Sequence, residues 1–476
     1  MTFAAADQVL TVRQMVAAEE RLMAAESPNA TDVHELMQRA GRGAADYVWR
    51  MAAGAPEGHG VTVLCGPGNN GGDGYVIAEA IRERGGQVQV VAAREPGTDA
   101  ARRAASLYRG PVVAAEQARG WILVDCLFGS GLNRALSAEL DTMLAGLAHR
   151  HHRAVAIDVP SGVNTDTGAL LAANLPHYAL CIALGAWKRT HMLMPAMATW
   201  DKARLVDIGA AREPGGAVRI ERPRLSAPAA DAHKYRRGLI AVLGGAMPGA
   251  GMLSARAAAH AGAGYVKLLA REAKAAPDWL VVSETGDGDL PDVLSDDRIA
   301  ALLVGPGLGR DDNARARLKA ALASGRRMVL DADALMLLDA PTHPTLPDVI
   351  LTPHEGELAR LERHFGLDLA VAKPDRALAL AKACGAVVVA KGPDTVIAAP
   401  DGRLAFAGHV SSWLSVAGTG DVLAGLCAAR LAVTLDPFRA ACEAVWLHGE
   451  AARLAGTAFH AGDLADAVRP ALDTCL

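Results

Sequence analysis

Brief apolar runs alternate with helically periodic segments along the first half of the chain. Two helical segments come first, within residues 11–53, where apolar side chains recur every three or four positions. The runs that follow are short enough to be buried parallel strands, and helical or loop segments separate them. This pattern predicts a doubly wound α/β domain. Its expected strands are Val61–Cys65, Gln87–Ala93, Trp121–Phe128, Ala154–Val159, Tyr178–Leu184 and Ala203–Ile208.

The same alternation begins again in the second half of the chain. Helical patterns separate several of its apolar runs and continue from Val422 to about Gly456. Between the halves, residues 211–230 are rich in Pro, Gly and Arg and carry little apolar periodicity. We therefore expect a domain at 1–213, a linker at 214–228 and a second α/β domain at 229–476. Its expected strands are Leu239–Leu243, Tyr265–Leu269, Trp279–Val282, Ala301–Val304, Met328–Asp331, Val349–Leu351, Val387–Ala390, Thr395–Ala398 and Leu404–Phe406.

Composition narrows the class of protein. A chain of 476 residues is too long for one ordinary core, and its net charge of −4 favours neither a nucleic-acid nor a membrane partner. The 7 cysteines include no CxxC pair, which argues against a disulfide framework and a cysteine zinc site. Gly238–Ala255 is uncharged, but its glycines and Pro248 make it a poor spanning helix. Without a signal-peptide pattern at the N-terminus, we expect a cytoplasmic protein.

The stretch Val416–Gly425 carries the strongest indication of chemistry. Gly418 and Gly420 permit close approach of the backbone to a ligand, and the apolar run from Val422 predicts that a helix begins there. Free N–H groups at a helix N-terminus favour a phosphate, and Asp421 stands where a general base would be needed. An N-cap aspartate after a glycine turn is the alternative interpretation.

Three loops of the first half carry a second set of polar residues. Gly66–Gly74 matches G-x-G-x-x-G, follows a predicted strand, and should open a helix from Tyr75, so its amides could hold a phosphate. Asp125 and Asp158 each end another strand of the same sheet. With Asn70 and Ser161 nearby, these carboxylates suit a hard cation, although each aspartate alone could be a cap.

The motifs GPGNNGGDG, DCLFGSGLNR and AIDVPSGVNTDTG, in this order, resemble the NAD(P)H-hydrate epimerase family over residues 10–212. The resemblance implies a Rossmann-like, three-layer αβα domain that binds a hydrated nicotinamide nucleotide. It implies K⁺ at Asn70, Asp125 and Ser161, with Asp158 and Lys188 as catalytic residues. A solvated surface lysine is the alternative for Lys188. The implied nucleotide-binding residues are Asn69, Asn70, Gly71, Gly72, Asp73, Gly129, Ser130, Gly131, Leu132, Asn133, Arg134, Ala135 and Asp158.

Epimerisation of the hydrated ring carbon requires proton transfer at its oxygen and transient loss of the carbon–oxygen bond, which Asp158 or Lys188 could assist. From the sequence we expect Asp158→Asn to abolish epimerisation and to leave the fold intact.

The second half contains GPGLG, TPHEGE, KGPDT and GTGDVLAG in series, each of the first three after a predicted strand, and no P-loop. These motifs resemble those of the ADP- or ATP-dependent NAD(P)H-hydrate dehydratase family, a branch of the ribokinase-like α/β fold. The chain departs from that pattern at Ser411–Ser415, where many relatives carry Asn-Pro-Gly. The resemblance assigns the hydrated substrate to Ala250, Gly307, His354 and Asp421, with a capping or core role as the alternative for His354. It assigns the adenine nucleotide to Lys391, Gly392, Pro393, Asp394, Thr395 and Gly420.

The resemblance thus implies a bifunctional repair enzyme that epimerises NADHX and NADPHX and dehydrates the S epimer, with ADP as phosphoryl donor and Mg²⁺ as cofactor. In the expected mechanism Asp421 takes the hydroxyl proton while the phosphoryl group arrives. A small-molecule kinase with an accessory nucleotide-binding domain, and a non-catalytic nucleotide-binding protein, are the alternatives. The choice between ADP and ATP stays open. We also expect a homo-oligomer, of a size that the sequence does not define.

Overall fold

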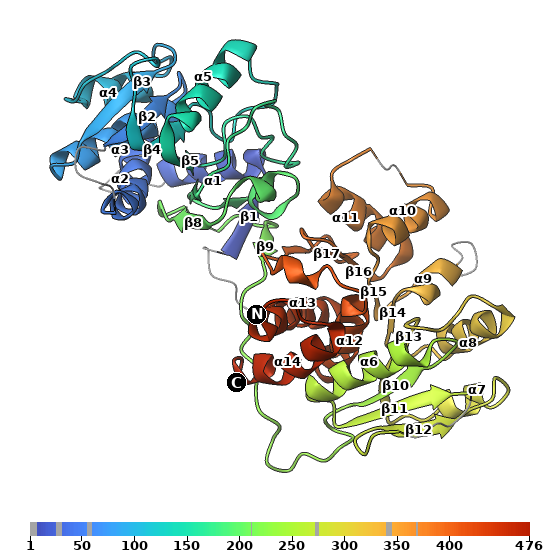
Figure 1. Ribbon diagram of the computed structural model, residues 1–476. Helices are drawn as coiled ribbons and strands as arrows, with labels where there is room; N and C mark the ends of the chain where they lie inside the picture. Colours follow the sequence, from blue (N-terminus) through green and yellow to red (C-terminus); the bar gives the residue numbers. More distant parts are fainter. Residues whose placement is uncertain are drawn as a thin grey trace. The chain divides into compact units, whose positions relative to one another are not determined.

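The computed structural model describes residues 7–24, 31–54, 60–210, 212–271, 276–338, 345–367 and 370–476. The chain forms two compact units, Met1–Val218 and Arg219–Leu476 (Figure 1). Within the described residues, no helix is long and apolar enough to cross a membrane.

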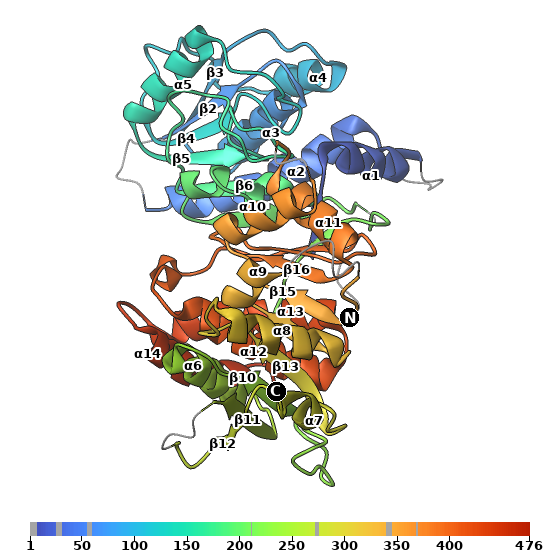
Figure 2. The same ribbon diagram turned by 90° about the vertical axis from the view of Figure 1, so that its right-hand side faces the viewer.

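A parallel sheet of order β3-β2-β4-β5-β6-β8 forms the centre of the first unit. Alternate strand side chains point to opposite faces, and both faces are buried. Val63 and Val124 pack against helices α2, α3 and α4, whereas Leu64 and Leu123 pack against α5, which gives three layers (Figure 2). The strands are β2 (Val61–Cys65), β3 (Val88–Ala92), β4 (Gly120–Cys126), β5 (His151–Ile157), β6 (Leu180–Leu184) and β8 (Ala203–Val206). The helices are α1 (Val12–Ala24), α2 (Val33–Ala52), α3 (Asn69–Glu83), α4 (Asp99–Leu107) and α5 (Ala138–His149).

A short strand near the start of the chain, β1 (Gln8–Leu10), was not predicted. It pairs in parallel with β7 (Trp187–Lys188), so that Leu10 lies opposite Lys188. It also pairs antiparallel with β9 (Ala217–Arg219), which begins within the predicted linker. The pairing fixes β7 and so helps to position Lys188.

The second unit contains a sheet of order β12-β11-β10-β13-β14-β15-β16-β17-β18, parallel from β12 to β16 and antiparallel thereafter. Helices α6, α12, α13 and α14 cover one face, and α8 and α9 lie on the other (Figure 1). The strands are β10 (Leu239–Leu243), β11 (Tyr265–Ala270), β12 (Val281–Glu284), β13 (Ile299–Val304), β14 (Met328–Leu330), β15 (Val349–Leu351), β16 (Val387–Ala390), β17 (Val396–Ala398) and β18 (Leu404–Phe406). The helices are α6 (Pro248–His260), α7 (Leu290–Leu294), α8 (Asp312–Ala323), α9 (Asp333–Leu337), α10 (Glu355–His364), α11 (Lys373–Cys384), α12 (Thr419–Thr434), α13 (Pro437–Ala455) and α14 (Ala461–Asp473).

Two predicted helix starts were wrong. Helix α3 begins at Asn69 rather than Tyr75, and α12 begins at Thr419 rather than Val422, so both glycine-rich stretches enter the first turns of helices. The helical patterns predicted up to about Gly456 form two helices, which are separated where Leu435 adopts a left-handed conformation (φ 57°) and Asp436 caps a new helix. Glycine lowers helix propensity, which is why these first turns were predicted as loops.

Candidate functional site

The first unit places a glycine-rich helix N-terminus at the carboxyl end of β2. A Cβ at Gly71 would lie 1.9 Å from the carbonyl oxygen of Gly66, so only glycine allows this approach of helix and loop. Helical hydrogen bonding begins with the amide of Gly72, which donates to the Gly68 oxygen at 3.2 Å. The preceding amides of α3 lack helical acceptors and can bind an anion.

Asp125, at the end of β4, is fully buried and accepts four hydrogen bonds. Its donors are the Leu127 amide (3.1 Å), the Ser161 amide (3.1 Å), the Ser161 hydroxyl (2.6 Å) and the Tyr178 hydroxyl (2.7 Å). Burial raises the pKa of Asp125, although the hydrogen bonds from Ser161 and Tyr178 oppose that shift. Tyr178 was not predicted as a site residue, since nothing in the sequence distinguishes it from a core tyrosine.

Asn70 lies at the same edge of the sheet. Its Nδ2 donates to the Ile157 carbonyl at 3.2 Å, whereas its Oδ1 is buried without a hydrogen-bond partner in the described structure. A Cβ at Gly129 would lie 3.2 Å from both Asn70 Cβ and Asp158 Oδ2, so these three residues are in close contact. The structure thus brings together residues that the sequence assigned to a cation and to the reacting ring.

Asp158 and Lys188 form a buried ion pair at the centre of this cluster. Lys188 is 1% exposed, so the alternative of a solvated lysine is wrong. Its ammonium group also donates to the Leu184 carbonyl, and Asp158 Oδ2 accepts from the Ser130 amide at 3.1 Å. Burial by itself would raise the pKa of Asp158, but the Lys188 charge outweighs it and lowers the pKa. Asp158 therefore stays ionised, in a left-handed backbone conformation (φ 66°).

His191 stabilises this pair from the backbone side. The Lys188 amide donates to Nδ1 at 2.9 Å, which leaves the proton on Nε2, 2.8 Å from the Asp158 carbonyl. Burial, reinforced by the Lys188 charge, lowers the pKa of His191 to about 4. His191 is thus neutral, and its tautomer is fixed.

Two further carboxyl groups face the Asp158–Lys188 pair. Burial first, and then the charges of Asp158 and Glu19, raise the pKa of Asp73 well above its ordinary value, which favours the neutral form of this predicted phosphate ligand. Glu19 was not predicted, because a single acid on an amphipathic helix carries no motif. It lies one turn beyond Met15, whose methyl group packs against Gly185. Burial raises the pKa of Glu19, and the nearby Lys188 charge opposes that shift.

The remaining predicted residues of the first unit surround this cluster. Asn69 Oδ1 accepts from the Thr98 hydroxyl at 2.7 Å, and Ser130 O accepts from the Thr165 hydroxyl at 3.0 Å. Gly72 packs against Met37, because a Cβ there would lie 2.4 Å from its methyl carbon. The loop beyond Ser130 is solvent-accessible and free to meet a ligand: Gly131, Asn133, Arg134 and Ala135 are exposed and Leu132 is half-buried.

In the second unit, the N-terminus of α12 carries Asp421 in its first turn. Gly418 is the N-cap, in a left-handed conformation (φ 91°), so the alternative of an N-cap aspartate is wrong. Burial, and then the negative charge of Asp331, raise the pKa of Asp421 to about 6. A carboxyl group with this pKa is ionised near neutral pH and is still basic enough to accept a proton.

Lys391 lies directly over the first turn of α12. Its Nζ is 2.7 Å from Asp331 Oδ1, and a Cβ at Gly420 would lie 3.3 Å from that nitrogen. Burial opposes the charged form of Lys391, but Asp331 outweighs it and raises the pKa of the lysine. A fixed positive charge therefore stands beside the free amides of the helix, as phosphate binding requires. Asp331 was not among the predicted site residues.

The other predicted residues line neighbouring loops. Gly392 and Thr395 close a turn in which the Thr395 hydroxyl donates to the Gly392 carbonyl at 2.8 Å; Pro393 and Asp394 lie between them, and Lys373 pairs with Asp394 at 2.6 Å. Gly307 and Ala250 are linked through Met247, whose amide donates to Gly307 O (2.9 Å) and whose carbonyl accepts from the Ala250 amide (3.3 Å).

His354 is the N-cap of α10 and accepts from the Gly356 amide at 3.0 Å. Its side chain is 62% exposed, so the imidazole caps the helix and still faces solvent. Its assignment to the hydrated substrate stays a prediction.

Comparisons with known proteins match both units. The family described as NAD(P)H-hydrate dehydratase matches residues 240–472, and the family of YjeF-related protein N-termini matches residues 33–190. The chain is 33% identical to the bifunctional NAD(P)H-hydrate repair enzyme Nnr of Salinibacter ruber, over 88% of each protein. It is 32% identical to the enzyme of that name from Escherichia coli, over 90% of this chain and 86% of that protein. A solved ADP/ATP-dependent NAD(P)H-hydrate dehydratase from Bacillus subtilis, co-crystallised with ATP and Mg²⁺, is 27% identical and covers 53% of this chain and 95% of its own, with a TM-score of 0.46.

Proposed function

The chain belongs to the family of bifunctional NAD(P)H-hydrate repair enzymes, and from this we propose which of its residues carry out each of the two reactions. In the proposal the first unit interconverts the R and S epimers of NADHX and NADPHX. The second unit dehydrates the S epimer to NADH or NADPH at the expense of ADP, which becomes AMP and phosphate. The observation that supports it most directly is Asp421, with a pKa of about 6, beside Gly420 and Lys391.

In the proposed dehydration, Asp421 accepts the proton of the ring hydroxyl while its oxygen attacks the terminal phosphoryl group. The amides at the start of α12 and the Lys391 ammonium stabilise the negative charge on the phosphoryl oxygens. The ring nitrogen then expels the phosphate, the adjacent carbon loses a proton, and the dihydronicotinamide is regenerated.

Mg²⁺ would neutralise charge on the nucleotide phosphates. Among the described residues, no three His, Cys, Asp or Glu side chains are grouped as metal ligands. The Asp331 carboxylate forms an ion pair with Lys391, and the Asp333 carboxylate forms one with Arg310 at 2.7 Å. These residues suit a cation that arrives with the phosphates and keeps much of its water, as Mg²⁺ commonly does.

In the proposed epimerisation, the Lys188 ammonium protonates the ring hydroxyl, which leaves as water while the ring nitrogen supplies electrons to the carbon. Water then adds to either face of the ring, and its proton returns to Lys188. Before the reaction begins, Asp158 keeps Lys188 protonated, and Ser130 and His191 hold Asp158 in place. The raised pKa of Asp73 limits the negative charge that this residue would place beside the substrate phosphates.

The buried polar atoms of the first unit fit a potassium ion. Asn70 Oδ1 is an unpartnered buried oxygen, and the oxygens of Asp125 and Ser161 lie at the same sheet edge. Neutral and carboxylate oxygens are the donors that hard cations prefer. A bound K⁺ would supply positive charge near the substrate phosphates and satisfy Asn70.

We therefore expect epimerisation to depend on K⁺ and on Asn70. Replacing K⁺ by choline, or Asn70 by Leu, should lower the epimerisation rate about 10- to 100-fold, the effect typical of disturbed metal sites. Asn69→Leu is the matched control, because Asn69 Oδ1 already accepts a hydrogen bond from Thr98. The epimerisation rate of this variant should still rise when K⁺ is added. Equal rates in K⁺ and choline for the wild-type chain would contradict a potassium site.

The two activities can be tested together by following NADH absorbance in a mixture of both NADHX epimers, the purified chain, ADP and Mg²⁺. We expect complete conversion to NADH, because the first unit converts the R epimer into the substrate of the second. If the NADH formed equals only the amount of S epimer in the mixture, the epimerase assignment is contradicted. No conversion with ADP or ATP would contradict the dehydratase assignment and favour a small-molecule kinase.

A further inference from the structure

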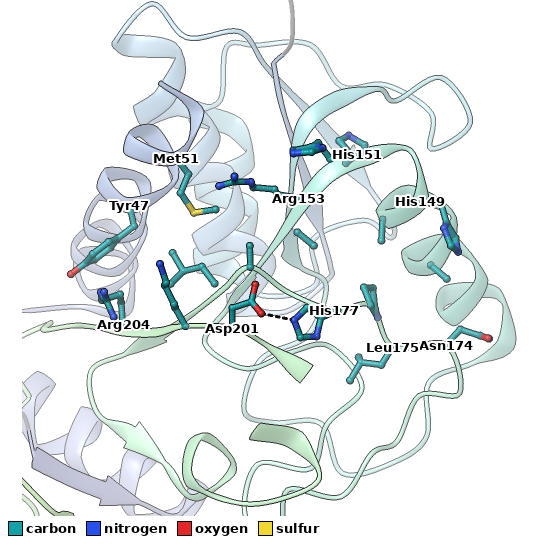
Figure 3. A pocket seen from close by; sticks show the side chains of 18 of the residues that line it. Tyr47, Met51, His149, His151, Arg153, Asn174, Leu175, His177, Asp201 and Arg204 are labelled. Atoms are coloured by element: carbon teal, nitrogen blue, oxygen red, sulfur yellow. Dashed lines mark hydrogen bonds and ion pairs between the residues drawn. The ribbon is translucent and has the colours of Figure 1, made fainter. Parts of the chain in front are cut away.

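The first unit contains a large cavity that the proposed reactions do not use. Its volume is about 1040 Å³, and it opens at the starts of β5, β6 and β8, between the last turns of α2 and α5 (Figure 3). The proposed epimerase residues Asp125 and Asp158 lie at the opposite, carboxyl ends of the strands, and neither lines it. The cavity is therefore separate from the epimerase site.

The charges around this cavity are strongly unbalanced. Four cations line it, Arg50, Arg153, Lys202 and Arg204, against one carboxylate, Asp201. Asp201 is already bonded to His177 at 2.9 Å, as Figure 3 shows. None of the four cations forms an ion pair with any residue that the structure describes, whereas many arginines elsewhere in the unit do, such as Arg82 with Glu79. Like charges around a concave surface produce a positive potential that attracts anions.

The cavity also offers flat and apolar surface. Tyr47 and Met51 form one wall beside Arg204, and Leu175 lies on the other side (Figure 3). The Arg50 guanidinium lies 6.0 Å from the centre of the Tyr47 ring, so positive charge and aromatic surface are adjacent. Cavities of this size accommodate small organic ligands and cofactors. A free phosphate ion would leave most of the space and the apolar wall unfilled.

We propose that this cavity binds a nucleotide polyphosphate, with the phosphates between Arg153, Lys202 and Arg204 and the base against Tyr47 and Met51. Arginine suits this role because its guanidinium donates two hydrogen bonds at once to phosphate oxygens. The inference goes beyond the proposed function, because it places a second ligand at the edge of the sheet opposite the epimerase site.

The test is the number of ATP molecules that the full chain binds in calorimetry. Arg153→Glu with Arg204→Glu should bind one ATP fewer than the wild type, because the reversed charges repel phosphate. Since the measured quantity is a difference, it does not depend on whether the second unit also binds ATP. The matched control reverses two exposed arginines outside the cavity, Arg13→Glu with Arg109→Glu, and should leave the number unchanged.

Tripolyphosphate serves as the second probe. The cavity variant, Arg153→Glu with Arg204→Glu, is shown to be folded if its epimerisation rate and its thermal unfolding temperature equal those of the wild type. We expect ATP to bind the cavity at least about tenfold more tightly than tripolyphosphate, the free-energy equivalent of about 1.4 kcal/mol. If the wild type and the cavity variant bind the same number of ATP molecules per chain, the proposal is overturned. Equal affinity for tripolyphosphate would overturn its nucleotide part and indicate a site for phosphate chains alone.

Discussion

Asp421→Asn is expected to lower the rate of dehydration by about 10²- to 10⁴-fold, the usual contribution of a general base. The substitution keeps the size of the side chain and removes its ability to take the hydroxyl proton. Nucleotide binding should persist, since Lys391 and the amides of α12 are untouched. Epimerisation by the first unit is an internal control in the same chain and should be unchanged. The measurement is NADH formation from S-NADHX, with the affinity for ADP determined separately.

The pH dependence distinguishes a base from a merely structural aspartate. The pKa of Asp421 is raised to about 6, so the ionised, active form is lost as the pH falls through that value. The wild-type kcat/KM should therefore be flat well above pH 6, reach half of its plateau near pH 6, and approach a tenfold fall for each unit of pH well below it. The residual activity of Asp421→Asn should lack this fall. A variant that retains wild-type kcat would exclude Asp421 as the base.

Asp158→Asn is expected to abolish epimerisation and also to destabilise the first unit. Asparagine leaves the Lys188 ammonium buried without its counter-charge, and breaking a buried pair in this way costs about 3–5 kcal/mol. The structure thus revises the expectation from sequence that this variant leaves the fold intact. Thermal unfolding together with the rate of R-to-S conversion would measure both effects, while dehydration of S-NADHX reports on the second unit.

The double variant Asp158→Asn with Lys188→Met separates catalysis from stability. It removes both charges, so much of the lost stability should return while epimerisation stays absent. Lys188→Met alone should be inactive, with burial and the lost partner then raising the pKa of Asp158. Restored epimerisation in the double variant would show that the ion pair is structural only.

Strands were predictable where short apolar runs end at glycine, proline or a polar residue. Val61–Cys65, Leu239–Leu243 and Val349–Leu351 begin and end where the sequence indicates, because burial of both faces requires continuous apolar residues. The helix starts were missed because glycines at Gly71 and Gly418 serve close contacts that local propensity does not encode. Pro437, a typical first-turn residue, could have revealed the break between α12 and α13.

The candidate site was predictable where a residue belongs to a glycine-rich loop, as do Asn70 and Gly420. Residues recruited by tertiary structure were not, and Glu19 is the example. It is a single acid on a helix, and the groups that surround it come from segments far away in the chain. The ionisation states were also unpredictable, since burial sets the pKa of Asp73 and Asp421.

The left-handed backbone at Asp158 limits which amino acids can replace this residue during evolution. Most side chains are strained at a φ of 66°, whereas glycine, asparagine and aspartate tolerate it. Neutral substitutions at position 158 are therefore expected to give glycine or asparagine, which keep the turn but cannot neutralise the charge of Lys188. A lineage that loses epimerisation by this route would carry an uncompensated lysine, and a second change at Lys188 would then be favoured for solubility and abundance alone.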